Sequence, residues 1–323
     1  MSGTAAGAVA GRPTFGRVRR WLSRTLLEPE YPQVAVEVRP RALAAVRLSR
    51  EGRRPALGAA TVAELPEGPL DVALTRNNVV DPDGFGAALR AALERVGALS
   101  GGPLSLVLPD PAVRLALVST DGLRGRRAEA EETIRFRLHK ALPFDVRQAR
   151  LAWDGARGEQ ALVAVVLEEV VRGYEEAVEA LGFEPGVVEV ASLALASLQD
   201  EGQDDVDRLL VNWDATYVSF LLQRGEQPLL MRTLPGEGGV EGVLRQATST
   251  LQFYRDRLSG PGLGEVVVRA AVGPAEEALA ALKPALGDGT RLLQPWAVLG
   301  PVKTDVPSQG LAGAAASVLR RVS

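Results

Sequence analysis

The residue types that could do chemistry are few in this chain. It has no cysteine and a single histidine, His139. Disulfides, thiolate nucleophiles and cysteine-based metal sites are therefore excluded, and a Ser-His-Asp triad or a zinc site would have to be built on His139 alone. Because His139 ends a charged run with helical spacing, we interpret it as a solvated or hydrogen-bonded side chain. The sequence predicts no catalytic residue and no metal site.

A glycine-rich turn is the one candidate for anion binding that the residues suggest by themselves. The segment at 236–239 reads GEGG, contains Gly238 and Gly239, and directly precedes a segment with helical spacing. Backbone amides at the start of a helix can hold a phosphate, and glycine lets such a group approach closely. A glycine run between a strand and a helix is also ordinary turn chemistry, so both interpretations remain open.

Composition and charge are those of an ordinary globular protein. The 323 residues, 46% apolar and 24% charged, are enough for two domains of about 150 residues each. The net charge of −3 gives no general electrostatic reason to expect nucleic-acid binding. No uninterrupted apolar run reaches the ~18 residues that a membrane-spanning helix needs, so we expect no transmembrane helix.

Residues 1–31 form a region of their own. The first residues are small, and residues 15–27 place apolar side chains at helical spacing beside a stripe of arginines. We expect a flexible tail followed by a basic amphipathic segment. Such a segment could lie on an anionic membrane surface, or it could pack on its own domain or on a partner protein.

From residue 32 onward one order of elements occurs twice. Each half has three strands with short turns, then a helix, then a buried strand. The expected ranges are 34–38, 43–49, 57–65, 85–99 and 104–109 in the first half, and 208–214, 216–223, 227–234, 240–258 and 265–272 in the second. The acidic stretch 199–207 separates them. This repetition predicts two structurally related halves.

A different pattern interrupts the first half. A strand at 112–119 is followed by a charged helix at 124–142 and by a hairpin formed from 147–155 and 159–168. The helix leads into Leu142-Pro143-Phe144, where proline prevents its continuation. We expect these elements to form a small inserted α+β subdomain.

The order of these segments resembles the actin, hexokinase and Hsp70 fold, and specifically the PilM family of type IV pilus assembly proteins, which are similar to the cell-division ATPase FtsA. The most specific match is the helix that enters Leu-Pro-Phe and then a strand, in IRFRLHKALPFDVRQARLAWD at 134–154. STLQFYRDRL at 249–258 is similar to the family's helix before the last core strand, and GLAGAAASVLRR at 310–321 to its closing helix.

The resemblance implies a duplicated α/β domain with an inserted α+β subdomain. The first actin-like half would comprise 32–110 plus 169–200, the inserted subdomain 111–168, and the second half 206–323. The family also has a small helical lobe in the second half. Only GEGGVEGVLRQAT stands in that place here, so we expect the lobe to be reduced or missing.

The phosphate-binding turns depart from what the resemblance implies. ATPases of this fold have an Asp-x-Gly turn after the first strand of each half, where the phosphates and Mg²⁺ sit against backbone amides. The matching positions here are Glu37 and Arg39 in the first half, followed by Pro40, and Asn212 and Asp214 in the second. An arginine fills one glycine position, and an aspartate that would repel phosphate fills the other.

Two further losses affect the same cleft. The family's glycine cluster after the last core strand is reduced to Gly273, and the helical lobe forms one wall of the nucleotide site. The predicted result is a pseudo-ATPase without an ATP or Mg²⁺ cofactor, with a degenerate nucleotide cleft at Glu37, Arg39, Asn212, Asp214, Gly238, Gly239 and Gly273. The alternative is an active ATP-binding protein with divergent phosphate turns.

The resemblance also implies a partner. Members of the family are cytoplasmic, peripheral to the inner membrane, and bind the cytoplasmic tail of the bitopic protein PilN in a groove at the inserted subdomain. The same role here would make the chain a scaffold for a PilN-like protein and other pilus inner-membrane components, with possible peripheral membrane contact through residues 15–27. Leu142, Pro143 and Phe144 are candidates for the groove, or they complete the subdomain core. A second alternative is the cytoplasmic domain of a type II secretion component of the L class, which normally continues into a transmembrane helix.

Overall fold

The computed structural model describes residues 32–51, 54–123, 125–153, 159–199, 206–225, 227–236, 238–295 and 306–319. Contacts divide the chain into two units, 1–31 and 32–323. The predicted tail and the basic segment 15–27 lie outside the described residues and stay predictions. The description that follows concerns the second unit alone, in which no described helix is long and apolar enough to cross a bilayer.

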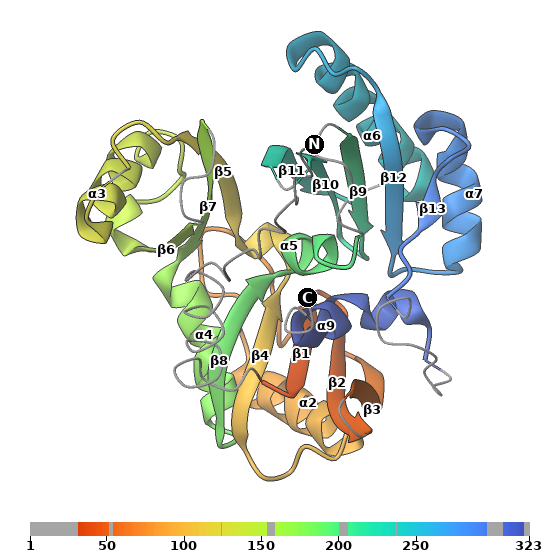
Figure 1. Cartoon of the computed structure of the whole chain (residues 1–323). Coiled ribbons are helices and arrows are strands. Elements are labelled where there is room, and N and C mark those ends of the chain that lie inside the picture. The colour runs from red at the N-terminus through yellow and green to blue at the C-terminus, as the bar shows by residue number, and fades with distance from the viewer. Residues whose placement is uncertain are drawn as a thin grey trace, which may run out of the picture. The chain divides into compact units, whose positions relative to one another are not determined.

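The first five-stranded sheet contains an antiparallel meander and two parallel strands (Figure 1). Its order is β3-β2-β1-β4-β8, and its strands are β1 (Val34–Arg39), β2 (Ala42–Glu51), β3 (Arg54–Glu64), β4 (Gly102–Leu108) and β8 (Phe183–Val190). The central strands β1 and β4 are buried along nearly all of their length, because both faces of the sheet are covered, as is typical of parallel pairing.

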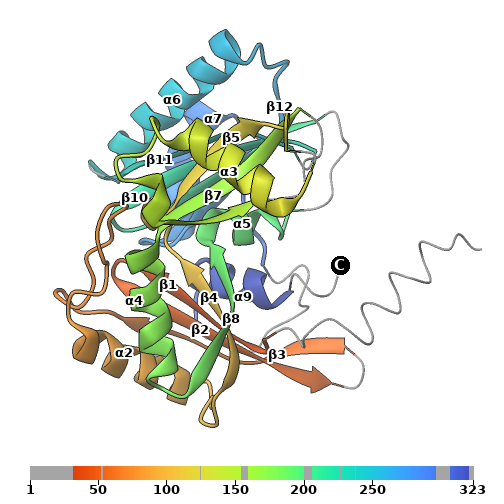
Figure 2. The ribbon, with the colours of Figure 1, turned by 90° about the vertical axis from the view of Figure 1, so that its left-hand side faces the viewer.

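Alternate residues of these strands face different helices. Val36 and Val38 pack with α2 (Pro82–Arg95) and α4 (Glu168–Glu179). Ala35, one position away, packs instead with the C-terminal helix α9 (Ser308–Leu319). Figure 2 shows α2 and α4 on one side of the sheet and α9 on the other. Side chains on a strand point alternately to the two faces, so each face of β1 packs against different helices.

The second sheet repeats the first. Its order is β11-β10-β9-β12-β13, again an antiparallel meander followed by parallel strands. The strands are β9 (Asp207–Trp213), β10 (Tyr217–Arg224), β11 (Gln227–Pro235), β12 (Leu263–Ala270) and β13 (Arg291–Leu292). The equal strand order confirms the predicted duplicated α/β fold.

Two helices cover one face of the second sheet. They are α6 (Gly239–Arg257) and α7 (Ala275–Leu286), and their buried side chains share a core with β9, β10 and β12. In the described part of the connection from β11 to β12, α6 is the sole helix. This agrees with the predicted reduction of the helical lobe.

The inserted elements form a three-stranded antiparallel sheet with one helix. Its order is β5-β7-β6, with β5 (Arg114–Ser119), β6 (Ala149–Trp153) and β7 (Gln160–Leu167), and α3 (Arg127–Leu138) shares a core with these strands. The turn between β6 and β7, at 154–158, lies outside the described residues.

The predicted limits of the helix at 124–142 are wrong at its C-terminal end. α3 ends at Leu138, so Leu142 to Phe144 lie between α3 and the short helix η2 (Val146–Gln148), and β6 begins only at Ala149. The side chain of Asp145 caps η2 by accepting from the Arg147 amide, 3.0 Å away. Arg135 donates to the carbonyls of Val146 and Ala149. The junction is thus tied back to α3 by an arginine.

Two helices, α5 (Ala191–Ala196) and α9, lie between the two five-stranded sheets (Figure 1). Every residue of α9 from Gln309 to Leu319 is buried, and small side chains let it approach β1 closely. A Cβ atom added at Gly313 would lie 2.5 Å from the carboxyl carbon of Glu37. A side chain at position 313 would therefore have to displace the carboxyl group of Glu37, which Arg269 holds in place.

Substitution of two helical glycines should separate this steric effect from helix propensity. We expect Gly313→Ala to lower the free energy of unfolding by roughly 1–3 kcal/mol, because the new methyl group overpacks a buried carboxylate. Gly86→Ala in α2 is the matched control. Its Cβ would meet nothing within 4 Å, so the change should stabilise by about 0.5–1 kcal/mol. Urea denaturation measures both; a stabilising Gly313→Ala would contradict the close approach of α9.

Candidate functional site

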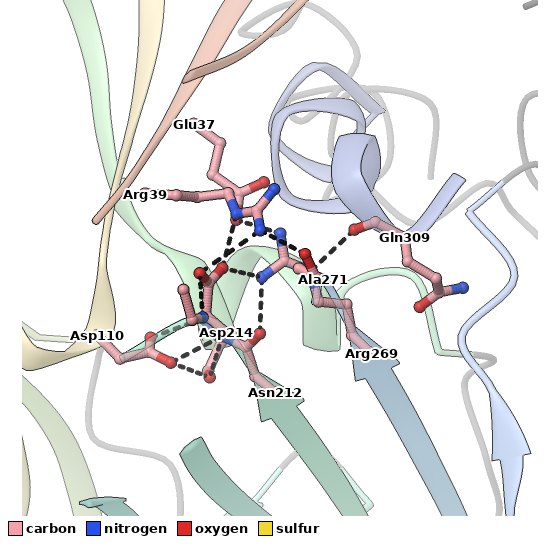
Figure 3. Close-up of polar contacts among 10 residues, drawn as sticks. Glu37, Arg39, Asp110, Asn212, Asp214, Arg269, Ala271 and Gln309 are labelled. Carbon is pink, nitrogen blue, oxygen red and sulfur yellow. Dashed lines mark hydrogen bonds and ion pairs between the residues drawn. The ribbon is translucent and has the colours of Figure 1, made fainter. Parts of the chain in front are cut away.

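The four residues predicted at the phosphate turns lie together in one buried network (Figure 3). Glu37 and Arg39 are on β1, Asn212 is on β9, and Asp214 follows the end of β9. Each side chain comes from the end of a strand that leads into a hairpin turn. All four are buried. The network therefore occupies the space between the first hairpins of the two sheets.

Arg39 reaches from the first sheet to the second. Its Nε donates to Asp214 Oδ2 at 2.6 Å, and its Nη2 donates to the Ala271 carbonyl at 2.7 Å. The arginine that stands at the expected glycine position thus fills the turn and ends on a carboxylate of the opposite turn. Arg39 and Asp214, the residues that replace the two expected glycines, are therefore hydrogen-bonded to each other.

Arg269 on β12 is the centre of the network, with a side chain that is 0% exposed. Its Nη2 donates to Glu37 Oε1 at 2.8 Å, and its Nη1 donates to Asn212 Oδ1 at 2.9 Å and to Asp214 Oδ2 at 3.1 Å. Its Nε donates to the carbonyl of Gln309 in α9 at 2.9 Å. One guanidinium therefore joins both sheets and the C-terminal helix.

The amide of Asn212 explains why an aspartate would not serve at this position. Its oxygen accepts from Arg269, while its Nδ2 donates to Asp110 Oδ2 at 2.9 Å. An ionised carboxylate has no proton to donate, so an aspartate at 212 would face Asp110 without a hydrogen bond. Asp110, in the short helix η1 (Asp110–Ala112), also accepts from the amide and hydroxyl of Ser192 in α5.

The network contains three carboxylates and two guanidiniums. Burial raises the pKa of Glu37, although Arg269 and Arg39 oppose the shift. Burial also acts to raise the pKa of Asp214, but Arg39 and Arg269 outweigh it and hold that pKa below its usual range. The raised pKa favours the uncharged form of Glu37 beside the ionised Asp214. Glu37 Oε2 has no hydrogen-bond partner in the described structure, which a neutral carboxyl tolerates better than an ionised one.

The predicted glycines lie outside this network. Gly238 is the N-cap of α6 and Gly239 its first residue, with φ angles of 81° and 57°. Gly273, with φ of 57°, is in the turn between β12 and α7. A left-handed backbone conformation accounts for glycine at each position. The structure therefore brings together four of the seven predicted cleft residues.

Of the predicted groove residues, Phe144 lines a cavity. Leu142 and Phe144 are partly buried against the core of the inserted subdomain, and Pro143 is exposed. Phe144 also packs against the core of the first half. The cavity beside it, which we name the Phe144 cavity, has a volume of about 500 Å³ and is lined by Thr75, Phe144, Arg147, Gln148, Ala149, Leu167, Glu168, Glu169 and Arg172.

Sequence reasoning missed three members of the network: Arg269, Asp110 and Ser192. One signal was available for Arg269, because it interrupts an apolar run, 265–272, that was expected to be a buried strand. A charge in such a strand needs a buried partner. No comparable signal marks Asp110 or Ser192. Within the described residues, no group of three or more acidic or histidine side chains is placed to hold a metal ion.

The titration of Glu37 gives a test of the charge balance. Because its pKa is higher in the folded than in the unfolded chain, the wild type should lose stability as pH rises above 4.5. Glu37→Gln keeps an oxygen to accept from Arg269 and removes that loss. We expect the melting temperature of the variant, relative to wild type, to rise between pH 4.5 and about pH 8. A relative fall would show that Glu37 is ionised in the folded chain.

No protein-family model and no curated protein matches the chain. Solved structures do match it. A chain of the PilM-PilN type IV pilus biogenesis complex has a TM-score of 0.73 at 22% identity, covering 90% of this chain and 98% of that chain. EpsL is an inner-membrane component of the type II secretion system of Vibrio cholerae. Its cytoplasmic domain has a TM-score of 0.47 at 11% identity, covering 75% of this chain and 83% of that chain. A Bacteroides thetaiotaomicron protein with an actin-like ATPase fold has a TM-score of 0.49 at 9% identity. The match covers 81% of this chain and 90% of that chain. The chain has a PilM-like, actin-like ATPase fold.

Proposed function

We propose that this chain is a cytoplasmic scaffold of a type IV pilus, or related secretion, inner-membrane assembly complex, and that it works without ATP. The observation that supports this most is the buried ion network. The chain's own side chains occupy the two turns against which ATPases of this fold hold nucleotide phosphates. No ATP or Mg²⁺ cofactor is part of the proposal.

Two backbone donors of the second turn are already in use. The Ala215 amide donates to Asp214 Oδ1 at 2.7 Å, and the Asp214 amide donates to the Tyr217 carbonyl at 2.9 Å. In the first turn, Pro40 has no amide proton to offer. A phosphate placed here would meet the Asp214 carboxylate and would have to compete with it for these donors.

The two guanidiniums do not form a ready-made phosphate site either. Arg39 and Arg269 are buried and already donate to carboxylates and carbonyls of both halves. Freeing Arg269 would take away the donor to Glu37, and freeing either arginine would remove one of the two guanidiniums bonded to the buried Asp214. Breaking such a buried network is strongly unfavourable. Nucleotide binding would therefore require the network to be taken apart.

The Phe144 cavity is the proposed site for a partner. It lies where the inserted subdomain meets the first half, since its lining comes from η2, β6, the end of β7 and the start of α4. Phe144, Ala149 and Leu167 supply apolar surface, and Glu169 and Arg172 supply charges of both signs. Such a lining suits an extended peptide with one apolar anchor residue. We propose the cytoplasmic tail of a PilN-like bitopic protein as its ligand.

The same proposal places the chain at the inner membrane through its partners. The PilN-like tail would hold it there, other inner-membrane components of the pilus would contact it, and residues 15–27 would add peripheral contact with the lipid surface.

Thermal shift measurements with two ligands test this function. A synthetic PilN-type tail peptide at saturating concentration should raise the melting temperature by several degrees, since binding at 100 times Kd stabilises by ~2.7 kcal/mol. Mg-ATP at millimolar concentration should leave it unchanged. A rise with Mg-ATP would contradict the loss of nucleotide binding.

A pair of phenylalanine variants locates the peptide. Phe144→Ala should weaken peptide binding because it removes the apolar anchor surface, whereas Phe136→Ala, in a side chain that is 75% exposed on α3, should not. Isothermal titration calorimetry gives both dissociation constants. Equal affinity of the two variants would place the tail elsewhere.

A further inference from the structure

We propose that the buried ion network is a latch that holds the two halves and α9 in one closed arrangement in the absence of any ligand. We name Glu37, Arg39, Asp214 and Arg269 the latch residues. The inference deepens the proposed function, and it rests on the proposal that nucleotide does not bind at these turns. Without a bound nucleotide, the bonds between the two halves at this place must come from the chain's own side chains.

The latch residues supply bonds that cross between the halves. Arg39 of β1 donates to Asp214 and to the Ala271 carbonyl, and Arg269 of β12 donates back to Glu37 of β1. The two arginines thus cross in opposite directions. A further crossing bond runs from Asn212 to Asp110. Hydrogen bonds with charged partners are the strong ones, and these lie where water does not reach.

The third part of the latch is α9. The Gln309 carbonyl accepts from Arg269, and the Gln309 side chain donates to the Leu293 carbonyl at 2.7 Å. On the first half, the Ser317 hydroxyl lies 2.6 Å from that of Ser105 on β4. The helix is therefore bonded to both halves. Gly313 lets it close over the Glu37 carboxylate.

Partial opening of the latch is unfavourable for two reasons. Withdrawal of one arginine removes hydrogen bonds and a positive charge from buried carboxyl groups. The network is also bordered by an apolar core to which both sheets, α5 and α9 contribute, including Val107, Leu210, Val267 and Ala312. Opening would have to expose this core and break the ion pairs together, so intermediate arrangements should be sparsely populated.

The consequence is a closed state that the chain's own residues maintain without a ligand. Closure of the halves would not respond to nucleotide, and the inserted subdomain with its Phe144 cavity would be presented to a partner in one fixed orientation. The chain would act as a permanently closed member of a fold whose ATPases place nucleotide between the halves.

Spin-label distances test the latch directly, because the chain has no native cysteine. Ala91→Cys on α2 and Ala280→Cys on α7 are exposed positions, one on each half. Double electron–electron resonance on the full chain should give one narrow distance distribution, identical with and without Mg-ATP. Arg269→Met and Arg39→Met should each broaden the distribution or shift it to longer distances.

Arg224→Met is the matched control. It removes a guanidinium that pairs with Asp207 within the second half, so the distribution should stay narrow. A broad distribution in the parent protein, or a narrow one in Arg39→Met, would overturn the latch. If Arg269→Met does not fold, the distance distribution of Arg39→Met alone tests the latch. If only the latch proposal is wrong, the distance distribution should be broad and unchanged by Mg-ATP. A distribution that becomes narrower when Mg-ATP is added would contradict the proposed function as well.

Discussion

A fully buried guanidinium must find acceptors for its donors and counterions for its charge, and Arg269 imposes this requirement on everything around it. Asp214 balances its charge, and Glu37 and Asn212 accept further hydrogen bonds from it. Its Nε donates to the Gln309 carbonyl, so the start of α9 must lie against this network. The same close approach leaves no room for a side chain at Gly313.

The PilM-like fold determines where the residues of the network meet. The duplicated sheets bring the first hairpin of each half to the same place, which is where an ATPase of this fold needs glycines and free amides. Here that place holds Arg39 and Asp214, bonded to one another at 2.6 Å. The Phe144 cavity, which shares no lining residue with this network, lies between the inserted subdomain and the first half. The chain therefore fills the space between the two turns with its own side chains.

Much of the fold could be predicted from local patterns, whereas the bonding of the site could not. The strand-strand-strand-helix-strand order occurs twice, and alternation and turn residues make each strand recognisable. The end of α3 was misplaced because the Arg135 bonds that hold the following segment do not appear in its periodicity. The missing glycines at Arg39 and Asp214 predicted a degenerate cleft, which stays a prediction. Their pairing joins residues 175 positions apart, and no local signal reports such a contact.

The most direct measurement of the central claim observes the two arginines themselves. In protein labelled with ¹⁵N-arginine, the Nε–Hε signals of Arg39 and Arg269 can be assigned from their loss in the corresponding methionine variants. Because both groups are buried and bonded to acceptors, we expect both signals to exchange slowly with solvent and to keep their chemical shifts when millimolar Mg-ATP is added. Rapid exchange, or shifts that move with Mg-ATP, would show that the turns are open to nucleotide.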